Sequence, residues 1–110
     1  MEITINDKKI DLKFGVRFVR ELDKIAAVEV NGQSFGFSLQ KTLPALSAYD
    51  PVALSNVIYS ASYGATKRPS QNEIDDWIDS IDTLPTLYKG IIKEIESSNA
   101  TKLAAKNLKA

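Results

Sequence analysis

The stretch DPVALSNVIYSASYG, residues 50–64, predicts a helix that carries no charged side chain after its first residue. Asp50 is a preferred N-cap residue, because its carboxylate can accept hydrogen bonds from the free backbone N–H groups of the first turn. Pro51 suits the first helical position, where no N–H donor is needed. Gly64 is a good C-cap residue. Together these signals predict a helix over about residues 51–63.

Two lines of side chains run along this helix. The first has the spacing of a buried face and consists of Leu54, Val57, Ile58 and Ala61. The second lies away from it and consists of Val52, Tyr59 and Tyr63. We expect the second line either to meet another helix or to form part of an apolar surface for a partner.

The segment RPSQNEIDDWIDSID, residues 68–82, predicts the next helix. Ser70 and Glu73 have the spacing of a capping box, in which each side chain accepts a hydrogen bond from the other residue's backbone N–H. One face of the helix is apolar and consists of Ile74, Trp77, Ile78 and Ile81. The other side carries the acidic residues Asp75, Asp76, Asp79 and Asp82.

Hairpins and further helices are expected around these two segments. Alternating apolar residues on either side of Asn6-Asp7-Lys8 predict a β-hairpin over about residues 2–13. Asn31-Gly32 is a strong turn signal, so residues 28–37 form either a second short hairpin or a loop. Pro44 should shorten or kink any helix around it. Three more apolar stripes have helical spacing: Phe14, Phe18, Leu22 and Ile25; Leu39, Leu43 and Leu46; and Leu84, Leu87, Tyr88, Ile91 and Ile95.

The expected fold class is α+β, mainly α, with the N-terminal hairpin packed on about four to five short helices. We expect a single compact domain over residues 1–99. Residues 100–110 carry Lys102, Lys106 and Lys109 without any acidic residue. This basic C-terminal tail is expected to be either a frayed helix or disordered.

The composition argues against most catalytic chemistry. The 110 residues include no cysteine and no histidine, which removes thiolate nucleophiles and the commonest general base. Lys plus Arg and Asp plus Glu number 14 each, so no basic excess indicates nucleic acid or an anionic membrane as a partner. No apolar run approaches the roughly 20 residues that a membrane-spanning helix needs. We therefore expect a protein that is not an enzyme and needs no cofactor.

The acidic helix is the strongest candidate for a metal or acid/base site. Asp75 and Asp79 lie one turn apart, and Mg²⁺ can be held by one or two carboxylates together with a phosphate. No glycine-rich loop accompanies them, so a grip for the phosphate is lacking. A solvated face is the simplest interpretation, and a binding surface for a basic partner is the alternative.

Aromatic side chains are the other candidates for contact with a partner. Trp77 has the position of a core residue on its helix, but a contact residue would have the same spacing. The candidate partner-binding residues are therefore Phe35, Phe37, Tyr59, Tyr63, Trp77, Asp75 and Asp79.

Along its whole length the chain resembles a known family. MEITINDKKIDLKFGVRFVRELD is a short hairpin that runs straight into an F-G-x-x-F-x-x-E-L-D helix. VEVNGQSFGFSLQKTLPAL, DPVALSNVIYSA and KRPSQNEIDDWI follow, and an Ile-rich helix closes the chain. This order resembles the small tail assembly chaperones of long-tailed, siphovirus-type phages and prophages of Gram-positive bacteria.

The resemblance implies a non-enzymatic protein that binds the tape measure protein and assists tail tube assembly, with tail tube protein and further copies of itself as additional candidate partners. It implies a location in the cytoplasm of the bacterial host and absence from the mature virion. It also implies a longer form made by a programmed ribosomal frameshift, and Ala105-Lys106-Asn107 can be encoded by GCA-AAA-AAC, which contains the slippery heptamer A-AAA-AAC. The alternative function is a small cytosolic protein-binding adaptor or regulatory subunit unrelated to phage tails.

Overall fold

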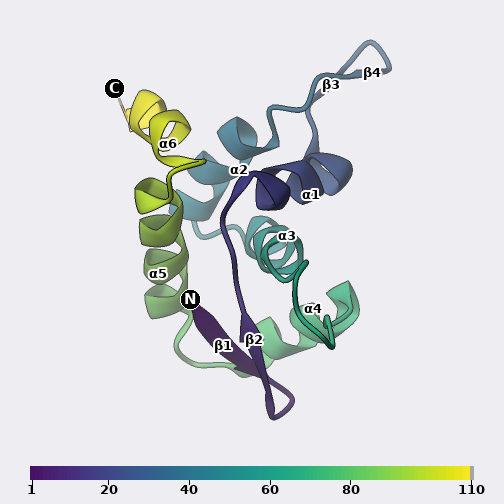
Figure 1. Ribbon diagram of the computed structural model, residues 1–110, viewed down its shortest axis with the longest axis vertical. Coiled ribbons are helices and arrows are strands. Elements are labelled where there is room, and N and C mark those ends of the chain that lie inside the picture. The colour runs from purple at the N-terminus through teal and green to yellow at the C-terminus, as the bar shows by residue number, and fades with distance from the viewer. Residues whose placement is uncertain (110) are drawn as a thin grey trace.

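The computed structural model describes residues 1–109, and in these residues six helices accompany two short antiparallel hairpins (Figure 1). The expected class, α+β and mainly α with an N-terminal hairpin, is confirmed. The elements are β1 (Glu2–Ile5), β2 (Lys8–Asp11), α1 (Val16–Ala26), β3 (Glu29–Val30), β4 (Gln33–Ser34), α2 (Ser38–Ser47), α3 (Pro51–Ala61), α4 (Gln71–Ser80), α5 (Leu84–Ser97) and α6 (Lys102–Lys109).

Helix α3 lies at the centre of the molecule, with α1, α2 and α4 packed around it (Figure 1). Its predicted apolar stripe is fully buried: Leu54, Val57, Ile58 and Ala61. The predicted cap is also confirmed, because Oδ1 of Asp50 accepts hydrogen bonds from the backbone N–H groups of Val52 at 2.8 Å and Ala53 at 3.2 Å. The apolar stripe and the N-cap together therefore place α3 as the sequence predicts.

The predicted end of this helix is wrong. Helix α3 ends at Ala61 with Ser62 as its C-cap, and Gly64 lies beyond it. The backbone N–H of Lys13 donates to the carbonyl oxygen of Ala61 at 3.0 Å, whereas the N–H of Ala65 donates to Ser62. The carbonyl that would continue the helix is thus bonded to the segment after β2, a contact that no local pattern indicates.

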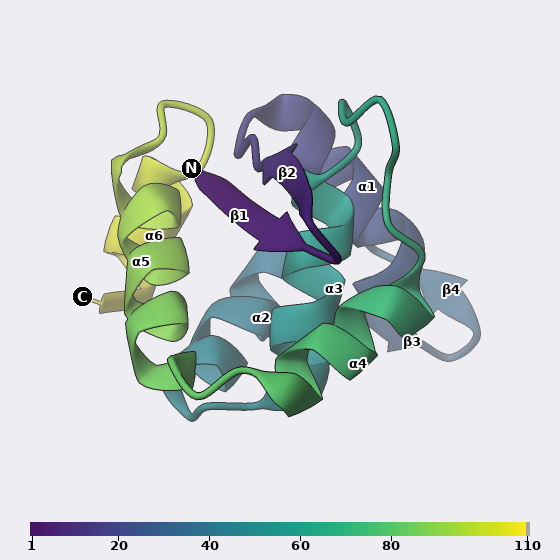
Figure 2. The same ribbon diagram turned by 90° about the horizontal axis from the view of Figure 1, so that it is seen from below.

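The hairpin β1–β2 lies between α4 and α5 in both views (Figures 1 and 2). Asn6 and Asp7 form its two-residue turn, with φ angles of 51° and 64° that match the twist of the strands. Its inner face is buried as predicted and consists of Ile3, Ile5, Ile10 and Leu12. The second hairpin, β3–β4, is also present and turns at Asn31-Gly32.

One position of the first helical stripe is wrongly predicted. Phe18 and Leu22 of α1 are buried, but Ile25 is 41% exposed and Ala26 is buried in its place. The chain leaves the helix at Ala27 in an extended conformation, so the last inward position is the one four residues after Leu22. Both Ile25 and Ala26 are compatible with the helical spacing of the buried face, and the packing of α1 buries the smaller residue.

Residues 100–110 were expected to be either a frayed helix or disordered, and helix α6 occupies this region. It packs against α2 and α5, and Thr101 and Ala105 are buried there. The hydroxyl of Thr101 donates to the carbonyl oxygen of Ile95 at 2.6 Å and so ties the start of α6 to α5. The domain boundary at residue 99 stays a prediction. In the part of the chain described, none of the helices combines the length and the apolar character that crossing a bilayer requires.

The capping box of α4 gives the first testable prediction. The backbone N–H of Glu73 donates to Oγ of Ser70 at 3.1 Å, and the N–H of Ser70 donates to the Glu73 carboxylate at 3.2 Å. We expect Ser70→Ala to lower the free energy of unfolding by about 1 kcal/mol in urea denaturation, because the first turn loses its side-chain acceptor. Ser80→Ala is the control, since this exposed serine near the helix end bonds only the Trp77 carbonyl. Equal losses in both variants would contradict this role of the box.

Candidate partner-binding surfaces

The seven candidate residues do not form one site. Asp75 and Asp79 line a groove between α3 and α4. Tyr59 and Tyr63 are half-buried near the end of α3, and Trp77 is half-buried against the core. Phe35 and Phe37 are exposed near the second hairpin. The structure therefore presents separate surfaces.

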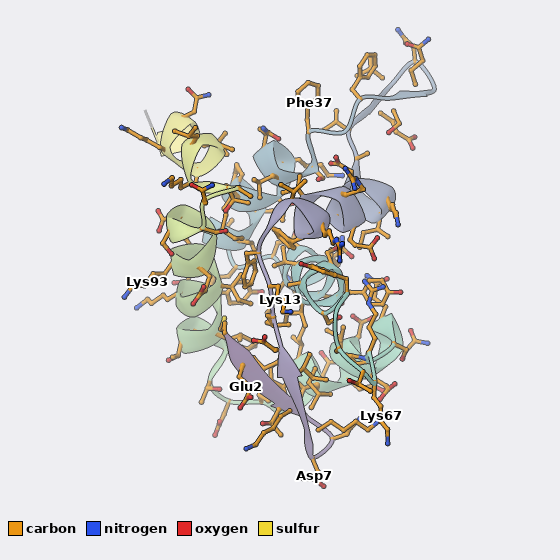
Figure 3. All side chains as sticks on the ribbon, in the orientation of Figure 1. Glu2, Asp7, Lys13, Phe37, Lys67 and Lys93 are labelled. Atoms are coloured by element: carbon orange, nitrogen blue, oxygen red, sulfur yellow. The ribbon has the colours of Figure 1, made fainter. Side chains whose placement is uncertain are left out.

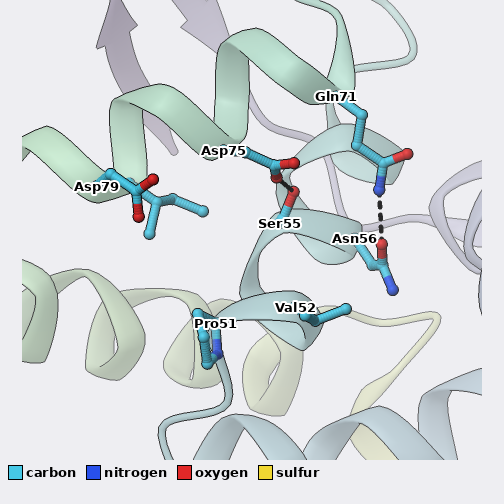
Figure 4. Close-up of a pocket in the computed structure, with 8 residues that line it drawn as sticks. Pro51, Val52, Ser55, Asn56, Gln71, Asp75 and Asp79 are labelled. Carbon is cyan, nitrogen blue, oxygen red and sulfur yellow. Dashed lines mark hydrogen bonds between the residues drawn. The ribbon is translucent and has the colours of Figure 1, made fainter.

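The groove between α3 and α4 has a volume of about 200 Å³ (Figure 4). Oδ1 of Asp75 accepts a hydrogen bond from the hydroxyl of the buried Ser55. Beside it, Nε2 of Gln71 donates to Oδ1 of Asn56 at 2.6 Å. These two bonds join the helices along the groove, and the first holds the Asp75 carboxylate in place. Asp75 and Asp79 are both exposed, and Asp79 lies at the far end of the groove.

The lining of this groove suits a basic side chain. Nowhere in residues 1–109 do three histidine, cysteine, aspartate or glutamate side chains gather as metal ligands. Pro51, Val52 and Ile78 add apolar surface to the lining. An apolar wall beside carboxylates suits a lysine or arginine side chain, whose stem packs on the wall while its charge meets the acids.

Tyr59 is in contact with another residue of the same chain, Arg68. The guanidinium of Arg68 lies over its ring, 3.9 Å from the centroid, and Nη2 of Arg68 donates to the Tyr59 carbonyl oxygen at 2.7 Å. The other end of the guanidinium pairs with Glu21 of α1 at 3.1 Å. One face of the ring is therefore covered by Arg68 rather than open to a partner.

Glu21 completes this link between α1 and α3. The ammonium of Lys24, hydrogen-bonded to its carboxylate at 2.6 Å, and the nearby Arg68 hold the pKa of Glu21 below its ordinary value. Glu21 forms ion pairs with both Lys24 and Arg68. The charge of Glu21 therefore serves tertiary structure.

Phe37 stands in a position that does not suit an aromatic residue. Its φ of 55° and ψ of 24° lie in the left-handed region, and it is the N-cap of α2 without a side-chain oxygen to accept a hydrogen bond. Asp23 of α1 supplies the missing acceptor, because its carboxylate bonds both the backbone N–H and the hydroxyl of Ser38. Phe37 is nevertheless 58% exposed, so burial gives no reason for the aromatic ring.

We call residues 28–37 the hairpin arm, because β3–β4 projects away from the helices (Figure 1), and Phe37 points outward near its base (Figure 3). Two backbone bonds close the base of the arm: Val28 donates to Gly36 at 2.7 Å, and Phe35 donates to Val28 at 2.9 Å. Val30 and Phe35 are about half exposed, at 51% and 50%. Three large apolar side chains thus face solvent on one small projection.

A family model described as "Phage tail assembly chaperone protein, TAC" matches residues 2–109, which include both hairpins and all six helices. The chain belongs to this phage tail assembly chaperone family. The match confirms the resemblance to phage tail assembly chaperones, and the type of phage and its host stay predictions. Neither curated proteins nor solved structures give a significant match.

Part of this chaperone's exposed surface was not found by sequence reasoning. Val30 is not among the residues predicted to contact a partner, although it is as exposed as Phe35 on the same arm. The Asn31-Gly32 signal could have identified it, because a hairpin of two-residue strands has no further sheet to cover either face. The contact of Arg68 with Tyr59 had no comparable signal.

The Arg68 contacts give the second prediction. We expect Arg68→Lys to lower the free energy of unfolding by about 1–2 kcal/mol, because one ammonium cannot reproduce the planar contacts with Tyr59 and Glu21. Thermal and urea denaturation measure the loss. The control is Lys67→Arg, which makes the reverse exchange of lysine for arginine at the exposed residue next to Arg68. It should leave the free energy of unfolding unaltered. Unchanged stability of Arg68→Lys would show that the network contributes nothing.

Proposed function

We propose that this protein binds the tape measure protein before and during tail tube polymerisation, and that it does so without catalytic activity. The observation that carries the proposal is the family match over residues 2–109. On this proposal the protein acts in the cytoplasm of the bacterial host and leaves before the virion is complete. A longer form made by frameshifting at codons 105–107 belongs to the same proposal, and the coding DNA would reveal whether a slippery heptamer is present.

The hairpin arm is the proposed apolar contact. A tape measure protein is a very long helical chain, and unassembled helical stripes expose apolar surface that aggregates. Val30, Phe35 and Phe37 offer exposed apolar side chains that can pack against such a stripe. Many copies on one long chain would add their weak contacts through avidity.

The conformation of Phe37 supports this assignment. A bulky side chain at positive φ costs about 1 kcal/mol or more, and an N-cap without a side-chain acceptor gives up further stability. Asparagine would tolerate the same backbone better. A residue that neither the backbone nor the core favours is accounted for by a contact outside the folded chain.

The groove that carries Asp75 and Asp79 is the proposed second contact with the same partner. Its apolar wall and carboxylates suit basic side chains on the edge of an apolar helical stripe. Charges at the rim of an interface mainly set association rate and selectivity, so we assign the groove a smaller share of the affinity than the arm. The tail tube protein remains a further proposed partner.

Co-expression with the tape measure protein of the same phage tests the proposal. The wild-type protein should keep the tape measure protein soluble and co-purify with it. Phe37→Asn should abolish this effect, while its own free energy of unfolding stays equal to or above that of the wild type, because asparagine accepts the left-handed conformation. Val16→Asn is the matched control, since this valine is also exposed but lies on α1.

The result decides between two functions. Failure of the wild-type protein to solubilise the tape measure protein would overturn the proposal and favour the unrelated adaptor. Solubilisation that survives Phe37→Asn would retain the function and reject the arm as its surface. Loss of solubilisation together with a large loss of stability would make Phe37 a structural residue.

A second variant in the same assay tests the acidic groove. Asp75→Asn with Asp79→Asn should weaken co-purification about threefold to tenfold at low salt and less at high salt, because the lost attraction is electrostatic. Asp76→Asn with Asp82→Asn is the control, since both residues lie on or next to α4 but outside the groove. Equal weakening by the two pairs would assign the effect to net charge instead.

A further inference from the structure

A second groove, of about 410 Å³, lies between β2 and the loop that joins α3 to α4. Four lysines line it: Lys8, Lys9 and Lys13 come from β2 and the segment after it, and Lys67 comes from the loop that follows α3. Figure 3 labels Lys13 and Lys67, which come from the two segments that form the walls. We call this feature the lysine groove.

Backbone contacts fix the walls of the lysine groove. The N–H of Lys13 donates to the carbonyl oxygen of Ala61 at 3.0 Å, which joins the segment after β2 to the end of α3. The N–H of Ala65 donates to Ser62 at 3.0 Å and closes the turn that leads to Lys67. The lysines are therefore brought together by the fold itself, and their spacing does not depend on a ligand.

The positive charge of the groove is balanced only in part within the described chain, where Lys8 interacts electrostatically with the carboxylate of Glu73. Lys9, Lys13 and Lys67 are exposed and form no ion pair with any side chain of residues 1–109. Asp11, which also lines the groove, lies 3.7 Å from the N-terminal ammonium of Met1. Like charges held in one groove repel each other, and carboxylates of a ligand would relieve that repulsion.

Arg68 shows what a structural basic residue looks like in the same loop. Its guanidinium is half-buried and pairs with Glu21, and it also bonds the Tyr59 carbonyl. Lys67, the adjacent residue, has none of these contacts and reaches the groove. Of these two neighbouring cationic side chains, Arg68 therefore makes contacts within the fold, and Lys67 is available to a ligand.

We propose that the lysine groove binds an acidic segment of a partner protein. Nucleic acid fits less well, because the chain has a net charge of zero and an isoelectric point near 6.2, and the groove lining has no aromatic residue on which a base could stack. The inference goes beyond the proposed function, since the groove lies outside the hairpin arm and needs no tape measure protein for its test.

The probe is a fluorescein-labelled polyglutamate peptide, and its binding is followed by fluorescence anisotropy at low and at physiological salt. Lys13→Gln with Lys67→Gln should weaken binding about fivefold to tenfold, because two charges of the groove are removed. The matched control is Lys102→Gln with Lys106→Gln, which removes the same charge from exposed positions on α6 and should weaken binding less than about twofold.

Each other outcome overturns the proposal. No binding by the wild-type protein, or equal weakening by the two pairs of substitutions, would show that the groove has no role. Tighter binding of an oligothymidine probe through the same lysines would assign the groove to nucleic acid. Self-association that depends on Lys13 and Lys67, measured by light scattering without the peptide, would make a second copy the occupant.

Lys9→Gln with Lys67→Gln repeats the test if the first variant melts at a lower temperature than the wild type.

Discussion

The burial of α3 is the constraint on which the rest of the structure depends. Leu54, Val57 and Ile58 are inaccessible to solvent, so this helix must be covered on several sides by a chain of only 110 residues. Helices α1, α2 and α4 provide that cover. Burial also reaches Ser55, whose hydroxyl must find an acceptor away from water, and Asp75 of α4 supplies it. The acidic groove is therefore a consequence of packing a central helix with polar positions.

Local signals predicted most of the fold, and tertiary contacts account for what they missed. The carboxylate of Asp50 caps the helical turn that follows it, and Asn31-Gly32 adopts positive φ angles itself. Both effects are local, so they can be read from the sequence. Gly64 failed as a helix end because Lys13, far away in the chain, bonds Ala61. The choice of Ala26 over Ile25 likewise depended on where α1 meets its neighbours.

The candidate surfaces follow the same division. That Asp75 and Asp79 share a face was visible from their spacing, and both line one groove. The partners of those residues were not visible, because Ser55 lies on another helix. Convergence of Lys13 with Lys67 is a still clearer case, since it requires β2 and the loop after α3 to be side by side. Sequence patterns identify faces of single elements, and grooves between elements need the fold.

Phe37 shows that a contact from another helix can remove the need for a capping side chain at a helix N-terminus. A helix N-terminus needs acceptors for its free N–H groups, and a side chain at the N-cap normally provides one. In α2 that acceptor is Asp23, which reaches the N-terminal turn from α1. Gly36 permits this approach, because a Cβ there would lie 3.3 Å from the Asp23 carboxylate at a φ of 71°. Since capping is supplied from outside the helix, the N-cap side chain is free to be aromatic and exposed, as the proposed contact with an apolar partner requires.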